Sequence, residues 1–292
     1  MIRRVRAAAA VTARRVAARA ARGYVAGATL GEARRTADVL LDRGYRLTLA
    51  YWDGVGEEPD TIVAQHRLAI EDIAAGGGDY VSVKAPSFGF DRDATAALVV
   101  HARARSVAVH FDSLALDTVD PTLDLISSIP GGAQGIGITI PGRWRRSPAD
   151  AVTLAAMGVV VRVVKGQWPD PGAPDLDPVE GFAAVVRAVA GTPGPVRVAT
   201  HDGSLARAAL TMLTAEGTPA ELELLYGLPV RRALDVVAGT RYPVRVYLPY
   251  GHGWLPYALD GLDRSPRLMM RLVRDAFGGR YLGGFRNLLT ES

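Results

Sequence analysis

The sequence contains no cysteine and only two lysines among its 292 residues. Without cysteine there are no disulfides and no thiolate metal sites, and this composition fits the reducing environment of the cytoplasm. Long apolar runs are missing too, since none approaches the roughly 20 residues that a membrane-spanning helix needs. With 49% hydrophobic and 22% charged residues, the chain instead has the material for an ordinary globular core.

A strong charge imbalance is also lacking. The 34 lysine and arginine residues face 30 acidic residues, which leaves a formal net charge of +4, with much of the excess near the N-terminus. This balance argues against a nucleic-acid-binding protein. Residues 1–22 alternate arginine with alanine and valine, a pattern that predicts a solvated basic helix. Contact with a membrane surface is the alternative, although the apolar side of this helix carries mainly small side chains.

From residue 23 onward, short apolar runs alternate with amphipathic stretches. The runs predict eight strands, at 45–52, 80–84, 106–111, 135–140, 159–165, 196–200, 222–226 and 244–248. The stretches between and after them predict helices, at 31–43, 60–75, 93–105, 120–128, 147–156, 178–190, 203–215, 229–238 and 253–276. We therefore expect residues 23–292 to form a single α/β domain, a (βα)8 TIM-type barrel with its site at the C-terminal ends of the strands.

The segment Gly158–Trp168, which reads GVVVRVVKGQW, is the most informative part of the chain. Its apolar run ending at a glycine predicts a buried parallel strand, yet Arg162 lies inside the run and Lys165 closes it. The only other lysine, Lys84, also closes an apolar run. Burying a cation is costly without a compensating partner. These cations therefore either pair with carboxylates in the core or face an anionic or electron-rich ligand at the strand ends.

Further polar residues collect at the predicted strand ends. With the cations they form the set Asp53, Lys84, Asp112, Arg162, Lys165, Thr200, His201, Glu223 and Tyr247. In a barrel these residues converge on one opening, where we expect Lys84 to pair with Asp112 from the adjacent strand. No group of histidines and carboxylates has the spacing of a metal site, and His66 is expected at the surface. The proline- and glycine-rich stretch Trp168–Pro178 is expected to cover a ligand as a loop.

Four longer segments follow one another in a recognisable order. They are VRVVKGQW at 161–168, VATHD at 198–202, LELLYGLP at 222–229 and VRVYLPYGHGWLPY at 244–257. Two earlier segments precede them, YVAGATLGEA at 24–33 and YVSVK at 80–84. Together these segments resemble the FAD-dependent proline dehydrogenase family over roughly residues 20–275. The resemblance implies that the barrel is distorted and that its last helix, within 253–276, packs over the C-terminal ends of the strands.

The resemblance also implies FAD as the cofactor and a role for each matching residue. Arg162 would lie beside the flavin atom N5, where a fixed cation stabilises the reduced ring. Cofactor-binding residues would be Arg162, Val164, Lys165, Gly166, Trp168, Thr200, His201, Asp202 and Glu223. Catalytic residues would be Lys84, Asp112, Arg162 and Tyr247. Substrate-binding residues would be Lys84, Tyr247, Tyr257, Asp260 and Arg264.

The segment of the last helix departs from the family pattern. Members carry two adjacent arginines that hold the carboxylate of proline, and here Asp260 and Gly261 occupy those positions. Losing such a bidentate pair typically costs about 3–5 kcal/mol when the remaining charge stays buried. Asp202 and Glu223 also add negative charge where the family has amides. The loss of the arginine pair predicts a substrate other than free L-proline, unless the carboxylate clamp has moved one helical turn to Arg264.

The resulting functional prediction is an FAD-dependent dehydrogenase of amino acid metabolism. It would move a hydride from a carbon next to nitrogen, in a small amine or amino-acid-like substrate, to flavin N5, and pass the electrons to a quinone or to oxygen. The alternatives are a true proline dehydrogenase with the shifted clamp and a non-catalytic flavin-binding partner protein. We expect a cytoplasmic protein, with contact to the inner face of the membrane as an option that rests on residues 1–22.

Overall fold

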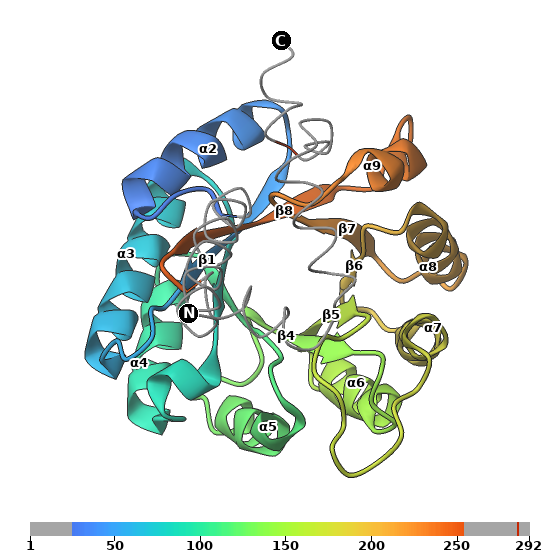
Figure 1. Ribbon diagram of the computed structural model, residues 1–292, viewed down its shortest axis with the longest axis horizontal. Coiled ribbons are helices and arrows are strands. Elements are labelled where there is room, and N and C mark those ends of the chain that lie inside the picture. The colour runs from blue at the N-terminus through green and yellow to red at the C-terminus, as the bar shows by residue number, and fades with distance from the viewer. Residues whose placement is uncertain (1–24, 254–284, 286–292) are drawn as a thin grey trace, which may run out of the picture.

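The computed structural model describes residues 25–253 and Phe285, which Figure 1 draws as a coloured ribbon. The basic helix predicted for residues 1–22 lies outside the described residues. The helix predicted for 253–276 also lies outside them, except for Gly253. The described part of the chain contains a complete closed sheet, and helices surround this sheet in Figure 1.

The strands form one closed parallel barrel in sequence order, in which β8 pairs with β1. They are β1 (Arg46–Trp52), β2 (Tyr80–Val83), β3 (Ala108–Phe111), β4 (Ile136–Pro141), β5 (Val160–Val164), β6 (Val196–Ala199), β7 (Ala220–Leu225) and β8 (Val244–Gly251). The (βα)8 TIM-type barrel that the sequence predicts is therefore confirmed. β8 continues to Gly251, beyond the predicted end at Leu248, because its last residues still pair with β1.

Helices in the described part of the chain lie outside the barrel (Figure 1). They are α2 (Leu30–Asp42), α3 (Pro59–Gly76), α4 (Arg92–Arg103), α5 (Val119–Ser127), α6 (Ser147–Ala156), α7 (Pro178–Val189), α8 (Gly203–Ala215) and α9 (Arg231–Val237). α2 precedes β1, and the others each connect two consecutive strands. Two short 3-10 helices, η2 (Ala85–Phe88) and η3 (Leu116–Thr118), follow β2 and β3.

Local sequence determines where several helices begin. Thr29 and Glu32 form a capping box at α2, in which each side chain accepts a hydrogen bond from the backbone of the other residue. Asp91, Asp177 and Asp202 cap α4, α7 and α8, because each carboxylate accepts hydrogen bonds from free backbone N–H groups of the first turn. The cap of α8 bears on the site, since Asp202 lies just beyond the C-terminal end of β6.

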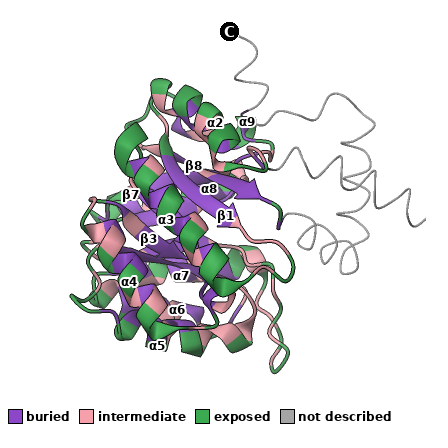
Figure 2. Cartoon of the chain, turned by 90° about the vertical axis from the view of Figure 1, so that its left-hand side faces the viewer, coloured by how far each residue is buried: buried purple, intermediate pink, exposed green. Residues whose placement is uncertain are grey.

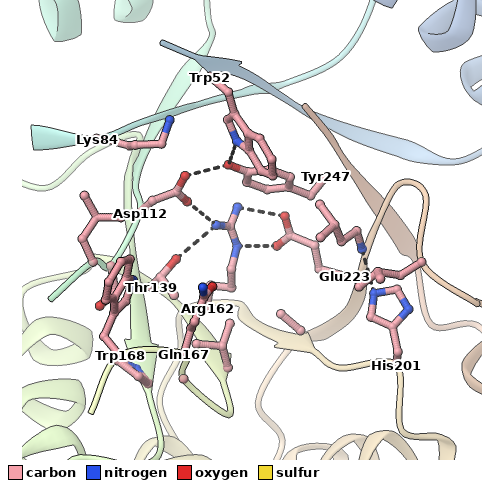
Figure 3. A pocket seen from close by; sticks show the side chains of 18 residues that line it. Trp52, Lys84, Asp112, Thr139, Arg162, Gln167, Trp168, His201, Glu223 and Tyr247 are labelled. Carbon is pink, nitrogen blue, oxygen red and sulfur yellow. Dashed lines mark hydrogen bonds and ion pairs between the residues drawn. The ribbon is translucent and has the colours of Figure 1, made fainter. Parts of the chain in front are cut away.

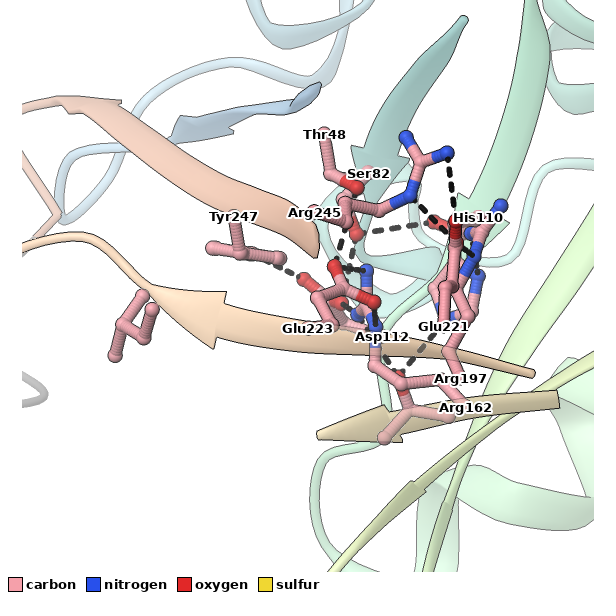
Figure 4. A network of polar contacts seen from close by, with 12 residues as sticks. Thr48, Ser82, His110, Asp112, Arg162, Arg197, Glu221, Glu223, Arg245 and Tyr247 are labelled. Atoms are coloured by element: carbon pink, nitrogen blue, oxygen red, sulfur yellow. Dashed lines mark hydrogen bonds and ion pairs between the residues drawn. The ribbon is translucent and has the colours of Figure 1, made fainter. Parts of the chain in front are cut away.

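The strands have an apolar outer face and a polar inner face. Outward residues such as Val161 and Val163 are buried between sheet and helices, and Figure 2 shows the buried strands beneath helices whose outer sides are exposed. Burial of such side chains contributes roughly 1.5–3 kcal/mol each. The inward face instead carries polar and charged groups. They are Thr139 and, among the residues labelled in Figure 4, Thr48, Ser82, His110, Arg162, Arg197, Glu221, Glu223 and Arg245.

Ion pairs close the N-terminal side of this polar interior. Glu221 Oε1 accepts from Nε of Arg197 at 2.5 Å and from Nε of Arg245 at 2.7 Å. Arg245 also donates to Asp79 at 2.8 Å, and the guanidinium of Arg197 lies 3.5 Å from the ring centroid of Tyr80. Because buried charges are tolerated only when paired, this network stabilises the barrel as a unit. The inner residues near the C-terminal strand ends line a cavity instead.

His66 is buried, although its sequence context predicted a surface position. It lies in α3, is only 1% exposed, and packs edge-on against the rings of Tyr51 and Phe88. The buried residues Ile62 and Ala69 lie one helical turn to either side of it. This spacing places His66 on the apolar face of the helix, which is the signal that the sequence offered.

Candidate active site

A cavity of about 430 Å³ opens at the C-terminal ends of the strands (Figure 3). This volume lies in the range of small-molecule binding sites. Every strand of the barrel contributes a lining residue, in order from β1 to β8 or just beyond: Trp52, Lys84, Asp112, Thr139, Arg162, Ala199, Glu223 and Tyr247. The sequence-predicted residues Val164, Gly166, Trp168 and His201 line it as well.

Arg162 occupies the centre of the cavity floor, where its position on β5 directs it into the barrel. Its Nε and Nη2 each donate to a different oxygen of Glu223, both at 2.8 Å. Nη1 donates to Asp112 at 2.8 Å and to Thr139 at 3.1 Å. Burial lowers the pKa of Arg162, but the two carboxylates outweigh burial and raise this pKa above its ordinary value. Arg162 therefore remains a cation, and it organises the floor.

Asp112, just beyond β3, links this cation to an aromatic wall. Its carboxylate accepts hydrogen bonds from Ser82 Oγ at 2.7 Å, from Arg162 and from the hydroxyl of Tyr247 at 2.6 Å. The Tyr247 oxygen in turn accepts from Trp52 Nε1 at 3.2 Å. Burial and the neighbouring Asp112 carboxylate raise the pKa of Tyr247 well above its usual value, so the phenol stays protonated. Figure 3 shows this chain from Trp52 to Arg162.

Lys84 does not pair with Asp112, contrary to the sequence prediction. Its Nζ donates to Asp53 at 3.1 Å and to the backbone oxygen of Tyr51 at 3.3 Å. Ser87 also donates to Asp53, at 2.9 Å. Burial raises the pKa of Asp53, but its contacts, led by Lys84, outweigh burial and hold this pKa below its ordinary value. The physical reason for the error is that both oxygens of Asp112 already have partners: Oδ1 accepts from Arg162 and Ser82, and Oδ2 accepts from the Tyr247 hydroxyl.

The segment after β5 forms one wall of the cavity. Gly166 has a φ of 94°, a left-handed conformation that favours glycine, and Gln167 and Trp168 follow it along the lining. Arg143, after β4, holds this segment by donating to the backbone oxygen of Gln167 at 2.6 Å and to Asp175 at 2.5 Å. Trp168, the first residue of the loop that the sequence predicts to cover a ligand, thus lines the cavity.

The rim residues after β6 are largely committed to the protein itself. Thr200 Oγ1 accepts from the backbone N–H of Asp202 at 3.2 Å. His201 bonds through Nδ1 to the Pro229 oxygen at 2.9 Å, and through Nε2 to the backbone N–H of Leu225 at 3.0 Å. This pattern fixes a neutral imidazole that donates from Nδ1, and burial lowers its pKa. Both ring nitrogens of His201 are therefore already engaged, whereas the Thr200 hydroxyl can still donate a hydrogen bond.

Lys165 and Asp202 form a half-exposed ion pair on the same rim, at 3.3 Å. Hydrogen bonds from Ser204 and Leu205, and then the contact with Lys165, hold the pKa of Asp202 at about 2. Lys165, Thr200 and Asp202 thus lie beside the cavity lining. The predicted substrate residues Tyr257, Asp260 and Arg264 lie outside the described residues.

Trp52, Thr139 and Gln167 are among the lining residues that the sequence did not predict. Thr139 pairs in register with Arg162, so both side chains point into the barrel. Trp52 lies two positions beyond Ala50 and four beyond Thr48, which both point into the barrel. The alternation of side chains along a strand therefore also predicts an inward position for Trp52. In the part of the chain that the structure describes, no group of three or more metal-ligating side chains occurs.

The chain was also compared with known proteins. No protein-family model matches it. It is 26% identical over 264 residues to proline dehydrogenase 1 of Bacillus subtilis subsp. natto, covering 84% of this chain and 87% of the relative. It is 29% identical over 225 residues to proline dehydrogenase of Deinococcus radiodurans, covering 70% of this chain and 72% of the relative.

Solved structures share the fold. The proline utilization A (PutA) structure from Bdellovibrio bacteriovorus, inactivated by N-propargylglycine, superposes with a TM-score of 0.72 at 16% identity, covering 91% of this chain and 36% of that chain. PutA from Corynebacterium freiburgense superposes with a TM-score of 0.67 at 19% identity. The match covers 91% of this chain and 33% of that chain. The chain thus spans about a third of the length of these PutA chains. Together with the sequence relatives, these matches confirm the resemblance to proline dehydrogenases.

Proposed function

We propose that this chain is an FAD-dependent oxidoreductase that acts on CH–NH donors, as its resemblance to proline dehydrogenases suggests. The observation that carries the proposal is the cavity at the barrel mouth, where Arg162, Asp112 and Tyr247 form one hydrogen-bonded floor. Charged and phenolic groups meet at this floor beside an apolar wall. This is the arrangement expected of an enzyme site.

The side chains that line the cavity support flavin as the ligand. Four consecutive strand ends contribute apolar lining side chains, namely Pro141, Val164, Ala199 and Leu225. An apolar slot next to a polar floor suits a ring with hydrophobic faces and polar edges. At the rim, Lys165 and the N-terminus of α8 offer positive charge for the phosphates of FAD. Asp202 opposes them there, because its carboxylate already caps α8.

A bound flavin supplies a two-electron acceptor for the hydride of the substrate. The chain's own residues prepare the substrate for that loss. Asp112 is positioned to take the proton of the substrate ammonium, because only a neutral amine releases hydride readily. Tyr247 and Ser82 hold the Asp112 carboxylate in place, and Trp52 and Tyr247 exclude water from this side of the cavity.

The proposed substrate is a small amine or amino-acid-like compound other than free L-proline. Support comes from the sequence, where Asp260 and Gly261 occupy the positions of the arginine pair found in proline dehydrogenases. We further propose a quinone or oxygen as the final electron acceptor. We also propose a cytoplasmic location, with contact of residues 1–22 to the inner face of the membrane as the alternative. Among the helices of the described residues, none has the length and apolar character of a membrane span.

Anaerobic reduction of the FAD-loaded protein tests the proposal. The protein is mixed with a panel of small amines and amino acids, and the loss of flavin absorbance is followed over time. At least one amine is expected to bleach the flavin faster than free L-proline does. Fast bleaching by dilute free proline supports the shifted clamp at Arg264 and contradicts the altered substrate. A flavin that no amine bleaches, in a protein that copurifies with another polypeptide, supports the non-catalytic alternative.

A further inference from the structure

Three side chains at the cavity floor, which we call the floor triad, do not balance in charge. They are Asp112, Arg162 and Glu223, and all three line the cavity. Arg162 is a single cation held between two carboxylates, at 2.8 Å from each. Figure 4 shows the two acidic side chains gathered around it.

Each carboxylate of the triad takes part in three hydrogen bonds, and each is paired with Arg162. Glu223 accepts from Nε and Nη2 of Arg162 and from Thr48 Oγ1. Asp112 accepts from Arg162, Ser82 Oγ and the Tyr247 hydroxyl. An ionised carboxylate is an acceptor only, and this is the form that pairs with a guanidinium. Two such carboxylates around the single Arg162 cation leave the triad with one formal negative charge in excess.

Other charged groups of the described mouth do not cancel this excess. Lys84 is matched by Asp53 at 3.1 Å, and Lys165 is matched by Asp202 at 3.3 Å. The excess charge also borders apolar lining side chains such as Val164, Ala199 and Leu225, and a charge acts more strongly on a ligand where the local dielectric constant is low. A ligand that reaches the floor thus meets a negative potential.

We propose that the floor triad recognises the positively charged nitrogen of the ligand and selects a cationic amine over a carboxylate. This inference rests on the proposed function and names its substrate class. In the reaction, an amine R2CH–NHR′ loses the hydrogen with both electrons of its C–H bond to the flavin acceptor. The nitrogen lone pair then forms the C=N bond, which leaves a cationic iminium. The excess negative charge stabilises the positive charge that develops in this step.

Glu223 is the specificity-determining residue of this arrangement. Glu223→Gln keeps the shape of the side chain and removes the excess charge, whereas Glu221→Gln is its matched control. Glu221 lies two residues earlier on the same strand, faces inward, and pairs with Arg197 and Arg245 below the floor. It does not line the cavity. Each variant thus removes one carboxylate charge from β7, Glu223→Gln at the cavity floor and Glu221→Gln below it.

Binding of two probes to the full-length chain tests the inference. Pyrrolidine carries an ammonium and no carboxylate at pH 7, and cyclopentanecarboxylate carries the reverse. Binding is read from the change in tryptophan fluorescence, because two of the four tryptophans, Trp52 and Trp168, line the cavity. The wild-type chain is expected to prefer pyrrolidine. Glu223→Gln is expected to weaken pyrrolidine binding about tenfold and to strengthen cyclopentanecarboxylate binding, while Glu221→Gln keeps the wild-type ratio.

Several results overturn the inference. One is a wild-type chain that prefers cyclopentanecarboxylate to pyrrolidine. Another is a Glu223→Gln variant in which the ratio of the two affinities is unchanged. An equal change in Glu221→Gln also contradicts the role of the triad. If Glu223→Gln does not fold, Asp112→Asn removes the same excess charge and is expected to give the same shift. Flavin absorbance is measured separately, so that failure of FAD binding is distinguished from failure of charge selection.

Discussion

Arg162 is the residue on which the rest of the site depends. It donates hydrogen bonds to Glu223, Asp112 and Thr139 within the barrel. Its sequence context allowed two interpretations, a core cation paired with carboxylates or a cation presented to a ligand. The structure combines them, because Arg162 is fully paired and also lines the cavity. The charge that a ligand meets is therefore that of the group around Arg162 and not that of the arginine alone.

Replacement of Arg162 by methionine is expected to destabilise the fold strongly. The variant leaves Glu223 and Asp112 as buried carboxylates without their cation, which typically costs about 3–5 kcal/mol. Urea unfolding measures the change in the free energy of unfolding. The double variant Arg162→Met with Glu223→Gln is expected to recover part of the loss, because it removes one stranded charge. A single variant as stable as the wild type contradicts the network.

Asp202→Asn is expected to increase the affinity for FAD several-fold. Asparagine still caps α8, but the change removes a negative charge from the rim and leaves Lys165 to attract the phosphates. Titration of the protein with FAD measures the effect. Binding of riboflavin, which lacks phosphates, is expected to stay unchanged.

A matched control is available at another helix. Asp177→Asn alters the corresponding cap of α7, where the carboxylate accepts from Val179 and Glu180. Asp177 does not line the cavity, so FAD affinity should not change. Unchanged or weaker FAD binding in Asp202→Asn would mean that the phosphates do not lie at this rim.

At the scale of elements, the sequence predicts the strands and helices well and their side-chain pairing poorly. Apolar runs such as 159–165 are short and bounded by glycine, and buried strands of a barrel need that pattern. Pairing depends on the register and reach of side chains from different strands. The partner of Lys84 was therefore predicted wrongly, although both Lys84 and Asp112 were placed correctly at the barrel mouth.

The loop after β5 is an element whose anchoring was not evident from the sequence. Arg143 fixes it through contacts with the backbone oxygens of Gly166 and Gln167 and with Asp175. The Trp144 indole also donates to the Trp168 oxygen, at 2.9 Å. These contacts join residues more than twenty positions apart, so only the folded barrel brings them together.

Arg143→Gln is expected to loosen this loop and to weaken ligand binding about tenfold. The variant loses several charge-assisted hydrogen bonds, each of which contributes at most roughly 1.5–3 kcal/mol to stability. Rearrangement of the loop recovers part of this loss. Limited proteolysis of residues 168–177 and FAD titration measure the two effects. Arg145→Gln, at an exposed neighbouring position, is the control and should change neither. Equal cleavage of all three proteins contradicts the anchoring role.

At the scale of the whole molecule, buried ionisable groups tie the stability of the barrel to pH. Burial, followed by the nearby Lys84, lowers the pKa of His66 to about 3. Asp53 acts in the opposite direction, and the other neighbours are the rings of Tyr51 and Phe88. In the unfolded chain a histidine takes up its proton near pH 6.5. Between these values the unfolded state binds a proton that the folded state does not.

The stability of the wild-type protein is therefore expected to fall as the pH drops below about 6.5. One such histidine contributes a slope of about 1.4 kcal/mol per pH unit. His66→Leu is expected to reduce this slope between pH 6 and 5 by about 1.4 kcal/mol per pH unit, the contribution of one proton. Urea unfolding at several pH values measures it, and His252→Gln at an exposed position is the control. A slope that His66→Leu leaves unchanged contradicts the buried neutral imidazole.

The most direct test of the account is whether the purified full-length chain binds FAD. The barrel mouth is expected to take up about one FAD per chain, giving a yellow protein whose flavin absorbance persists after gel filtration. Arg162→Lys is expected to retain the fold and to bind FAD less tightly, because it loses the bidentate contact with Glu223. A folded wild-type chain that stays colourless and takes up no FAD contradicts the proposed function.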